Sequence, residues 1–174
     1  YMKGFRGYDV DLAYEAIKKT SMQTRAGMNY VQKLEYIPAD VELESVGNAL
    51  EYAIDDWCVA QMAKALNKQD DYEYFSKRAK LYTLYFDTKT EFMRGKLKNG
   101  QWREPFNPLS SSHREDDYVE GNAWQYTWLV PQDPYGLIKL FGSEEKFVKK
   151  LDTLFTLEEG VVGDNASPDI SGFI

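Results

Sequence analysis

The chain has 174 residues, of which 43% are hydrophobic and 15% aromatic, and its formal net charge is -7 at pH 7. This length and apolar content fit one globular domain with a buried core and exclude an intrinsically disordered chain. The acidic balance argues against a nucleic-acid partner, because an acidic surface repels phosphate. No apolar run is long enough to cross a bilayer, so we expect no membrane insertion.

The N-terminal part of the chain is predicted to be helical. Apolar side chains between positions 10 and 17 recur at i, i+3, i+4 and i+7, the stripe of an amphipathic helix, and Asp9 is placed to cap it. Residues 27–38 follow as a short stretch without a regular pattern.

Two longer helices are predicted next. Residues 44–66 carry apolar groups on two opposite sides, which indicates a helix packed on both sides in the inner layer of a helical array. Residues 70–86 space their aromatic side chains by three and four, with Glu73 and Lys77 as an i, i+4 pair on the exposed side. A short turn near Asn67 makes the two helices an antiparallel hairpin.

The apolar period then changes to that of β-structure. Residues 92–98 and 101–106 flank Asn99 and Gly100, the dipeptide favoured in a two-residue type I′ turn, and so predict a β-hairpin. Residues 107–118 form a polar loop, and long loops inside compact domains are often functional.

The last part of the chain is predicted to hold three shorter helices. Residues 122–128 read as a short helix stopped before Pro131, and residues 133–141 as another. Ser143 is the expected cap of a helix that runs to about Phe155. The fold class expected is therefore all-α with a small β-hairpin.

The most informative chemistry follows the polar loop. Glu120 is succeeded within five residues by Asn122, Trp124 and Gln125. Sugar sites use these groups: an acid to protonate an oxygen, amides to bind hydroxyls and a flat ring to stack on a pyranose. Partial desolvation would raise the pKa of Glu120 and let it act as a general acid. The alternative is a loop glutamate that caps the following helical turn.

Asp55 and Asp56 are the second candidate pair. Side chains at adjacent helical positions diverge by about 100°, so the two carboxylates do not readily share one proton or one metal ion. We expect one to face a cavity, where it could bind substrate, and the other to bond a neighbouring element. Purely structural hydrogen bonding is the alternative for both.

Other motifs are absent or incomplete. The acidic run at 115–117 lacks the spacing of an EF-hand loop, and a solvated charge run is the simpler interpretation. Neither His113, the single histidine, nor Cys58, the single cysteine, has the partners of a zinc site or a nucleophile. No dinucleotide-binding, Walker or nucleophile-elbow motif occurs.

Three stretches together resemble the family 92 glycoside hydrolases, which are exo-acting α-mannosidases. They are residues 50–58, 92–96 and 120–128, the last reading Glu-Gly-Asn-Ala-Trp-Gln-Tyr-Thr-Trp, and residues 169–172 are a weaker fourth. Ile54 departs from the pattern, since an aromatic residue is common there. The resemblance implies an (α/α)6 toroid of the six-hairpin glycosidase type. Residues 1–174 would then be part of that catalytic domain, without the preceding β-sandwich domain and the remainder of the toroid.

The resemblance also implies an inverting mechanism with a general acid, a general base and a calcium ion that grips mannose hydroxyls. Glu120 matches the position of the general acid. The base would lie beyond Ile174, and the calcium ligands are not assignable here. Inversion needs a second carboxylate about 6.5–9.5 Å away to activate water, so the isolated chain is expected to bind sugar weakly and not to turn over.

Further expectations follow from the same resemblance. The partners would be mannose-containing glycans, and the location periplasmic or extracellular. Apolar helix faces left uncovered by missing toroid helices would favour self-association of the isolated chain. Two alternatives remain: a six-hairpin glycosidase for a different sugar, and a non-catalytic helical glycan-binding protein in which Trp102 and Trp124 bind the ligand.

Overall fold

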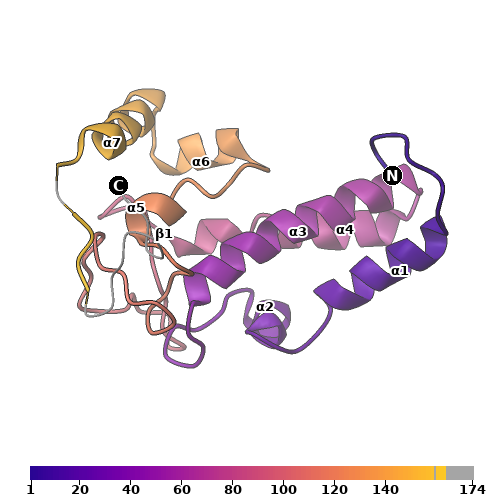
Figure 1. Cartoon of the computed structure of the whole chain (residues 1–174), viewed down its shortest axis with the longest axis horizontal. Coiled ribbons are helices and arrows are strands. Elements are labelled where there is room, and N and C mark those ends of the chain that lie inside the picture. The colour runs from indigo at the N-terminus through magenta and orange to yellow at the C-terminus, as the bar shows by residue number, and fades with distance from the viewer. Residues whose placement is uncertain (159, 164–174) are drawn as a thin grey trace.

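The structure is a computed structural model and describes residues 1–158 and 160–163. It is mostly helical with one small antiparallel sheet, as the sequence predicted. In chain order the elements are α1 (Val10–Ser21), α2 (Met28–Leu34), α3 (Ser45–Ala65), α4 (Gln69–Arg78), the 3₁₀ helix η1 (Leu81–Tyr85), β1 (Phe86–Asp87), β2 (Phe92–Met93), α5 (Ala123–Tyr126), α6 (Pro134–Leu140) and α7 (Glu144–Thr156). The long helix α3 runs through the middle of the molecule, with α4 alongside it and α1 on another side, while α6 and α7 lie near its N-terminal end (Figure 1).

The predicted helix starts are confirmed by their caps. The side chain of Asp9 accepts a hydrogen bond from the backbone N–H of Leu12 at the start of α1. Asp133 and Ser143 cap α6 and α7 in the same way. The α3–α4 hairpin turns at Asn67, which has a left-handed φ of 58°.

The second predicted helix ends earlier than expected. Instead of continuing to residue 86, α4 stops at Arg78, and the chain tightens into η1 and then enters β1. Distant bonds outweigh the helical spacing: the Tyr82 hydroxyl donates to Asp133 (2.8 Å), and the Tyr85 hydroxyl accepts from the backbone N–H of Ile37 (2.6 Å). Lys77 pairs with Glu35 of the α2 segment, not with Glu73 as predicted.

The β-structure also differs in detail. The regular ladder joins residues 86–87 to 92–93, and beyond it the predicted hairpin is reduced to a single bridge between Lys96 and Trp102. Only Gly100 of the Asn-Gly pair has a positive φ (83°), so the turn is not type I′. It is a three-residue loop closed by the bond from Leu97 N–H to the Gln101 carbonyl (2.7 Å). Helix α2 lies in the stretch that the sequence left irregular.

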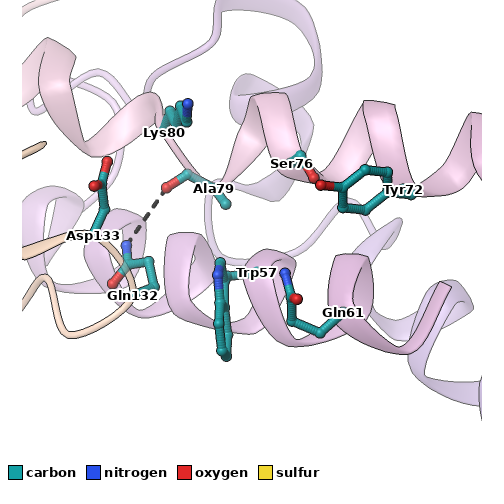
Figure 2. Close-up of a pocket in the computed structure, with 8 residues that line it drawn as sticks. All are labelled: Trp57, Gln61, Tyr72, Ser76, Ala79, Lys80, Gln132 and Asp133. Atoms are coloured by element: carbon teal, nitrogen blue, oxygen red, sulfur yellow. Dashed lines mark hydrogen bonds between the residues drawn. The ribbon is translucent and has the colours of Figure 1, made fainter. Parts of the chain in front are cut away.

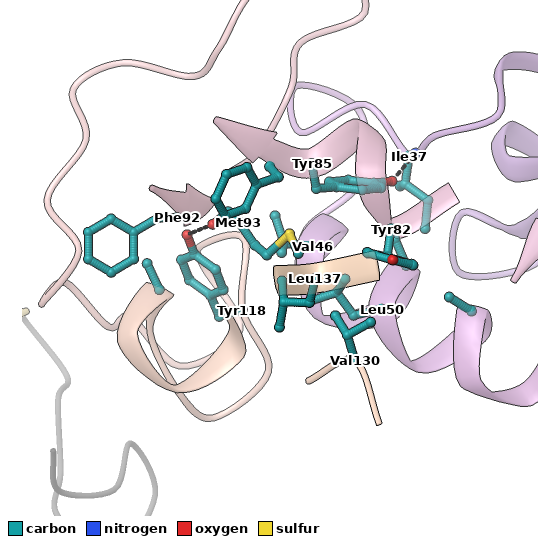
Figure 3. Close-up of a cluster of buried hydrophobic side chains, with 14 of the residues drawn as sticks. Ile37, Val46, Leu50, Tyr82, Tyr85, Phe92, Met93, Tyr118, Val130 and Leu137 are labelled. Atoms are coloured by element: carbon teal, nitrogen blue, oxygen red, sulfur yellow. Dashed lines mark hydrogen bonds between the residues drawn. The ribbon is translucent and has the colours of Figure 1, made fainter. Parts of the chain in front are cut away.

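The core consists of two clusters. The larger joins the N-terminal half of α3 to η1, the sheet, α5 and α6, and Figure 3 shows its central side chains around Leu50, Tyr82 and Met93. The smaller lies between α1, α3 and α4 and holds Tyr14, Val59, Ala60, Ala63 and Phe75.

The expectation that α3 is packed on two sides holds only in part. Leu50 is fully buried, but Trp57, which lies at i+7 on the same side of the helix, is 41% exposed. Within residues 1–158 and 160–163, no helix is both long and apolar enough to cross a membrane.

Candidate active site

The polar loop that precedes Glu120 is fastened to the first turn of α3. The backbone N–H groups of Val46 and Gly47 donate to the carbonyl of Asp117 (2.9 and 3.0 Å), and that of Glu44 donates to the carbonyl of Asp116 (2.7 Å). These are N–H groups that a helix cannot satisfy internally. The loop therefore acts as the cap of α3 and brings residues 118–122 against this end of the helix.

Both aspartates of the acidic run form hydrogen bonds that stabilise the fold. The carboxylate of Asp117 accepts from Ser45 Oγ (3.1 Å) and Arg103 Nη1 (2.8 Å). That of Asp116 accepts from the backbone N–H groups of Ser112 (2.6 Å) and Tyr118 (2.9 Å). Burial raises the pKa of Asp116 to about 6 despite these bonds. Within the part of the chain that the structure describes, no group of three or more potential ligands is arranged to hold a metal ion. The calcium ion that the resemblance implies stays without assigned ligands, and the interpretation of the acidic run as a solvated charge run is wrong for Asp117, which is buried.

Glu120 stands apart from its acidic neighbours. It is exposed and has a left-handed φ of 50°, an unfavourable region for a residue with a Cβ. Its side chain forms no hydrogen bond or ion pair with the described residues. The cap of the following helix is Asn122, whose side chain accepts from Gln125 N–H (3.3 Å). The structure thus leaves the Glu120 carboxylate available and gives the capping role to another residue.

Asn122 and Gln125 hold the turn after Glu120 through a reciprocal capping box. The Gln125 side-chain oxygen accepts from the backbone N–H of Asn122 (3.0 Å). Asn122 is fully buried, and its Nδ2 group has no hydrogen-bond partner among the described residues. A buried donor without a partner is uncommon and costs stability, which is a frequent property of functional sites.

The two tryptophans proposed as sugar platforms are not open surfaces. Trp124 is 7% exposed, with the edge of Phe92 against it (4.8 Å between ring centroids) and Lys150 Nζ 4.6 Å from its centroid. Trp102 is half-buried with Lys96 Nζ 4.7 Å from its ring centroid. Both rings are used in packing.

One residue of the 118–128 run was not singled out from the sequence. The Tyr126 hydroxyl donates to the carbonyl of Val119 (2.6 Å), directly before Glu120. Burial, and then the negative charges of Glu51, Glu44 and Glu120, raise the pKa of Tyr126 to about 12. Glu51 lies in α3 and Glu44 is its N-cap residue, and their i, i+7 spacing was the available sequence signal for this acidic surrounding.

Comparison with known proteins identifies the family. The model of the glycosyl hydrolase family 92 catalytic domain matches residues 1–171. The chain belongs to this family. It is 46% identical to a family GH92 alpha-mannosidase from Bacteroides thetaiotaomicron, whose solved structure it matches with a TM-score of 0.84 over 90% of this chain and 21% of that one.

Other relatives agree with this membership. The family GH92 inverting mannosidase from the same organism is 32% identical, with a TM-score of 0.80 over 87% of this chain and 21% of that structure. A protein described as an uncharacterised secreted glycosidase, from Arthroderma benhamiae, is 29% identical over 91% of this chain and 25% of its own length. The family 92 chain described here thus spans about a fifth to a quarter of these relatives.

The adjacent aspartates of α3 take separate positions, as expected from their spacing. Asp56 is buried and receives a bond from Arg78 Nε at 2.8 Å. Burial raises the pKa of Asp56 to about 7, with the charge of Arg78 acting in the opposite direction. Asp55 lines a hollow of about 260 Å³ between α1 and α3. This geometry favours a structural role for Asp56, and it leaves Asp55 as the member of the pair that a ligand can reach.

A second hollow, of about 230 Å³, lies between α3, α4 and the segment that joins α5 to α6 (Figure 2). Trp57 and Gln61 line it from α3, Tyr72 and Ser76 from α4, and Gln132 beside Ala79, to whose carbonyl it donates (3.5 Å). Glu120 lines neither this hollow nor the one beside α1, so both are separate from the candidate acid of the family 92 chain.

Proposed function

We propose that this family 92 chain supplies the general acid of an exo-acting, inverting α-mannosidase, and that Glu120 is that acid. The observation that carries the proposal is an exposed carboxylate without a partner among the described residues, held on a left-handed turn between a fastened loop and a capped helix. The mannosidases among its relatives support α-linked mannose as the substrate class.

In the proposed reaction, the protonated carboxyl of Glu120 gives its proton to the glycosidic oxygen as the bond to the anomeric carbon breaks. A second carboxylate activates water on the opposite face of the sugar, at the separation of about 6.5–9.5 Å that inversion requires. We propose that this base, with the rest of the toroid, lies outside the 174 residues, since the chain spans 21% of the mannosidase structures it matches.

The neighbours of Glu120 are assigned supporting parts. Asn122 and Gln125 fix the turn, and we propose that they shape the sugar pocket through it, since Asn122 itself is fully buried. Trp124 is buried in α5, the helix that follows the turn. We propose that Asp55 contributes to glycan binding from the hollow beside α1. Calcium stays a prediction without ligands here, and no step of the mechanism uses it.

The decisive test is Glu120→Gln in the full-length protein that contains this chain. Glutamine has the same shape but cannot donate a carboxyl proton. Turnover of α-mannosides with alkyl or sugar leaving groups should fall by about 10²–10⁴-fold, whereas binding of mannose-containing glycans, followed by calorimetry, should persist. Unchanged turnover of these substrates would refute the role of Glu120.

The matched control is Glu115→Gln. Glu115 is another exposed glutamate of the same loop region, so this variant makes the same chemical change five residues away. It should keep full turnover. An equal loss in both variants would indicate a general electrostatic effect of the acidic loop and not acid catalysis.

The sugar and the location are tested separately. A screen of the full-length protein with α-mannosides and α-glucosides distinguishes the mannosidase from a six-hairpin enzyme for another sugar. We propose a periplasmic or extracellular location from the relative named as a secreted glycosidase, and fractionation of cells tests it.

The isolated chain is expected to be inactive and to self-associate through uncovered helix faces, on which Trp57 and Tyr74 are each 41% exposed. Light scattering measures this. A clean monomer would contradict the expected self-association.

A further inference from the structure

Tyr126 holds the peptide that precedes Glu120. Its hydroxyl donates to the Val119 carbonyl at 2.6 Å, a short bond for an O–H donor. That carbonyl belongs to the same planar peptide unit as the backbone nitrogen of Glu120. Fixing the plane therefore fixes one side of the φ rotation that places Glu120 in the left-handed region, at 50°.

The ring of the same tyrosine holds the residue that follows Glu120. A Cβ added to Gly121 would lie 3.0 Å from Tyr126 Cε2 and 2.9 Å from Gln125 Oε1. Gly121 thus lies close to the ring, with no room for a side chain between them. One side chain contacts the chain both before and after Glu120.

The other side of the ring is set by α3. A Cβ added to Gly47 would lie 3.3 Å from Tyr126 Cε1 and 2.7 Å from Val119 Cγ2. The ring and the Val119 segment are therefore placed against the first turn of α3, which is a regular helix of 21 residues. Helices are more rigid than loops. The contacts of Tyr126 with α3 therefore restrict the movement of Glu120, an exposed loop residue.

Tyr126 also remains a donor over the pH range in which a glycosidase works. Burial and the nearby carboxylates of α3 keep its pKa near 12, so the hydroxyl carries its proton. The bond to Val119 is therefore present whichever protonation state Glu120 takes.

We propose that Tyr126 is the positioning residue of the acid: it imposes the left-handed conformation that directs the Glu120 carboxyl toward the leaving-group oxygen. A left-handed glutamate persists only when its surroundings impose that conformation, and the contacts above are those surroundings. This inference rests on the proposed role of Glu120, and Tyr126 itself does not contact the substrate.

The test is Tyr126→Phe in the full-length protein, assayed on two α-mannosides. Phenylalanine keeps the ring contacts and removes only the bond to Val119. With a poor leaving group such as methanol, kcat should fall by about ten- to a hundredfold, because a small misplacement of a catalytic group is costly. With 2,4-dinitrophenolate, which leaves without a proton, kcat should fall less than about threefold, since acid catalysis contributes little there.

A merely structural role would lower both activities together, and that result would overturn the inference, as would unchanged activity on both substrates. Tyr52→Phe is the matched control: it deletes a hydroxyl that donates to the Ala26 carbonyl (3.0 Å) from the middle of α3. This control should leave the ratio of the two kcat values unchanged.

Two further variants keep the outcome decisive. In Gly121→Ala, the added Cβ would displace the ring of Tyr126, and we expect the same dependence of kcat on the leaving group. This variant therefore tests the positioning role if Tyr126→Phe does not fold. Glu120→Gln separates the two proposals. If it retains activity with poor leaving groups, the proposed function fails. If it loses that activity while neither Tyr126→Phe nor Gly121→Ala changes the ratio, only the positioning role fails.

Discussion

Two regions of this family 92 chain are stabilised by different kinds of contact. Residues 9–80, the helical region, satisfy their backbone groups largely within α1–α4 and meet over a small core of alanines, Tyr14 and Phe75. Residues 81–130, the loop region, hold little regular structure and form a larger, more aromatic core together with the N-terminal half of α3 and with α6. Part of their backbone is fixed by side chains, as when the Tyr118 hydroxyl donates to the Met93 carbonyl (2.8 Å, Figure 3).

Both regions hold left-handed residues, but they differ in where these residues lie. A helix sets every φ inside it, so the left-handed glutamates of the helical region, Glu35 and Glu44, lie at helix ends. In the loop region several backbone groups bond side chains, and such partners can stabilise a conformation like that of Glu120 away from a helix end. Variants that remove one anchor from each region test this contrast.

The largest effect is expected in the helical region, from Arg78→Ala. The Arg78 guanidinium is buried, bonds the carboxylate of Asp56 at 2.8 Å and donates to the Ser21 carbonyl at the end of α1 (3.1 Å). Its loss leaves a buried carboxylate uncompensated, which typically costs about 3–5 kcal/mol. Chemical denaturation followed by circular dichroism measures the free energy of unfolding.

Lys77→Ala is the control for this prediction, because Lys77 is one residue earlier and pairs with Glu35 at the surface. Its stability should remain close to that of the native chain. The double variant Arg78→Met with Asp56→Leu should recover much of the loss, since replacing both buried charges by apolar groups is often neutral. A mild effect of Arg78→Ala would show that the helices do not depend on this pair.

The loop region is expected to respond to pH through Asp116. Its pKa is raised by burial to about 6, above the unfolded value near 3.9. The stability that this shift contributes is fully present below about pH 4 and is lost as the pH rises through about 6, by at most about 2–3 kcal/mol. Asp116→Asn should remove this slope, so the difference between the two unfolding curves across pH 4–7 isolates it.

Asp71 of α4 gives the opposite sign in the helical region. Burial works against it, but hydrogen bonds from Lys18 and Tyr14 lower the pKa of Asp71. Its contribution is present above the unfolded pKa and is lost as the pH falls through the lowered value. Asp71→Asn should therefore lose stability mainly above pH 4. The same sign for both aspartates would contradict the opposite effects of burial at Asp116 and of hydrogen bonding at Asp71.

The contrast also explains what the sequence predicted. Helix starts were found at Asp9, Asp133 and Ser143 because capping is local chemistry, readable within three residues. The early end of α4 was missed because its cause, the bond between Tyr82 and Asp133, joins residues 51 positions apart.

The candidate site divides in the same way. Glu120 was found from residue type and resemblance, and the structure shows its carboxylate exposed. The role of Tyr126 was missed because its hydroxyl bonds a main-chain carbonyl, and any residue at position 119 offers one. Trp124 was expected to stack on sugar, but composition does not reveal that Phe92 and Lys150 already cover it.

Gly47→Ala probes the junction between the two regions. In an ordinary helix this change is favourable by about 1 kcal/mol. Here the new Cβ would lie 2.9 Å from the backbone nitrogen of Val119, which cannot move without shifting the Glu120 turn. We expect a net loss of about 1–3 kcal/mol from overpacking, together with reduced turnover in the full-length protein. Asn48→Ala, one residue later, should change stability by less than about 0.5 kcal/mol, and a stabilised Gly47→Ala would show that the junction is loose.

The smallest effect is expected from Gly100→Ala at the tip of the 97–101 turn. Gly100 has a φ of 83°, and a Cβ there would meet nothing within 4 Å, so the only cost is that of the left-handed backbone, about 1–2 kcal/mol. Gly7 is the control, because a Cβ there also meets open space and its φ is not left-handed. Gly7→Ala should be neutral or slightly stabilising.

Thermal unfolding of both variants measures the difference in stability. This difference is the conformational cost of a left-handed residue that is not glycine, which the contacts around Glu120 must offset. If Gly100→Ala is as mild as Gly7→Ala, then left-handed turns cost little in this chain, and the bond from Tyr126 has correspondingly little strain to overcome at Glu120.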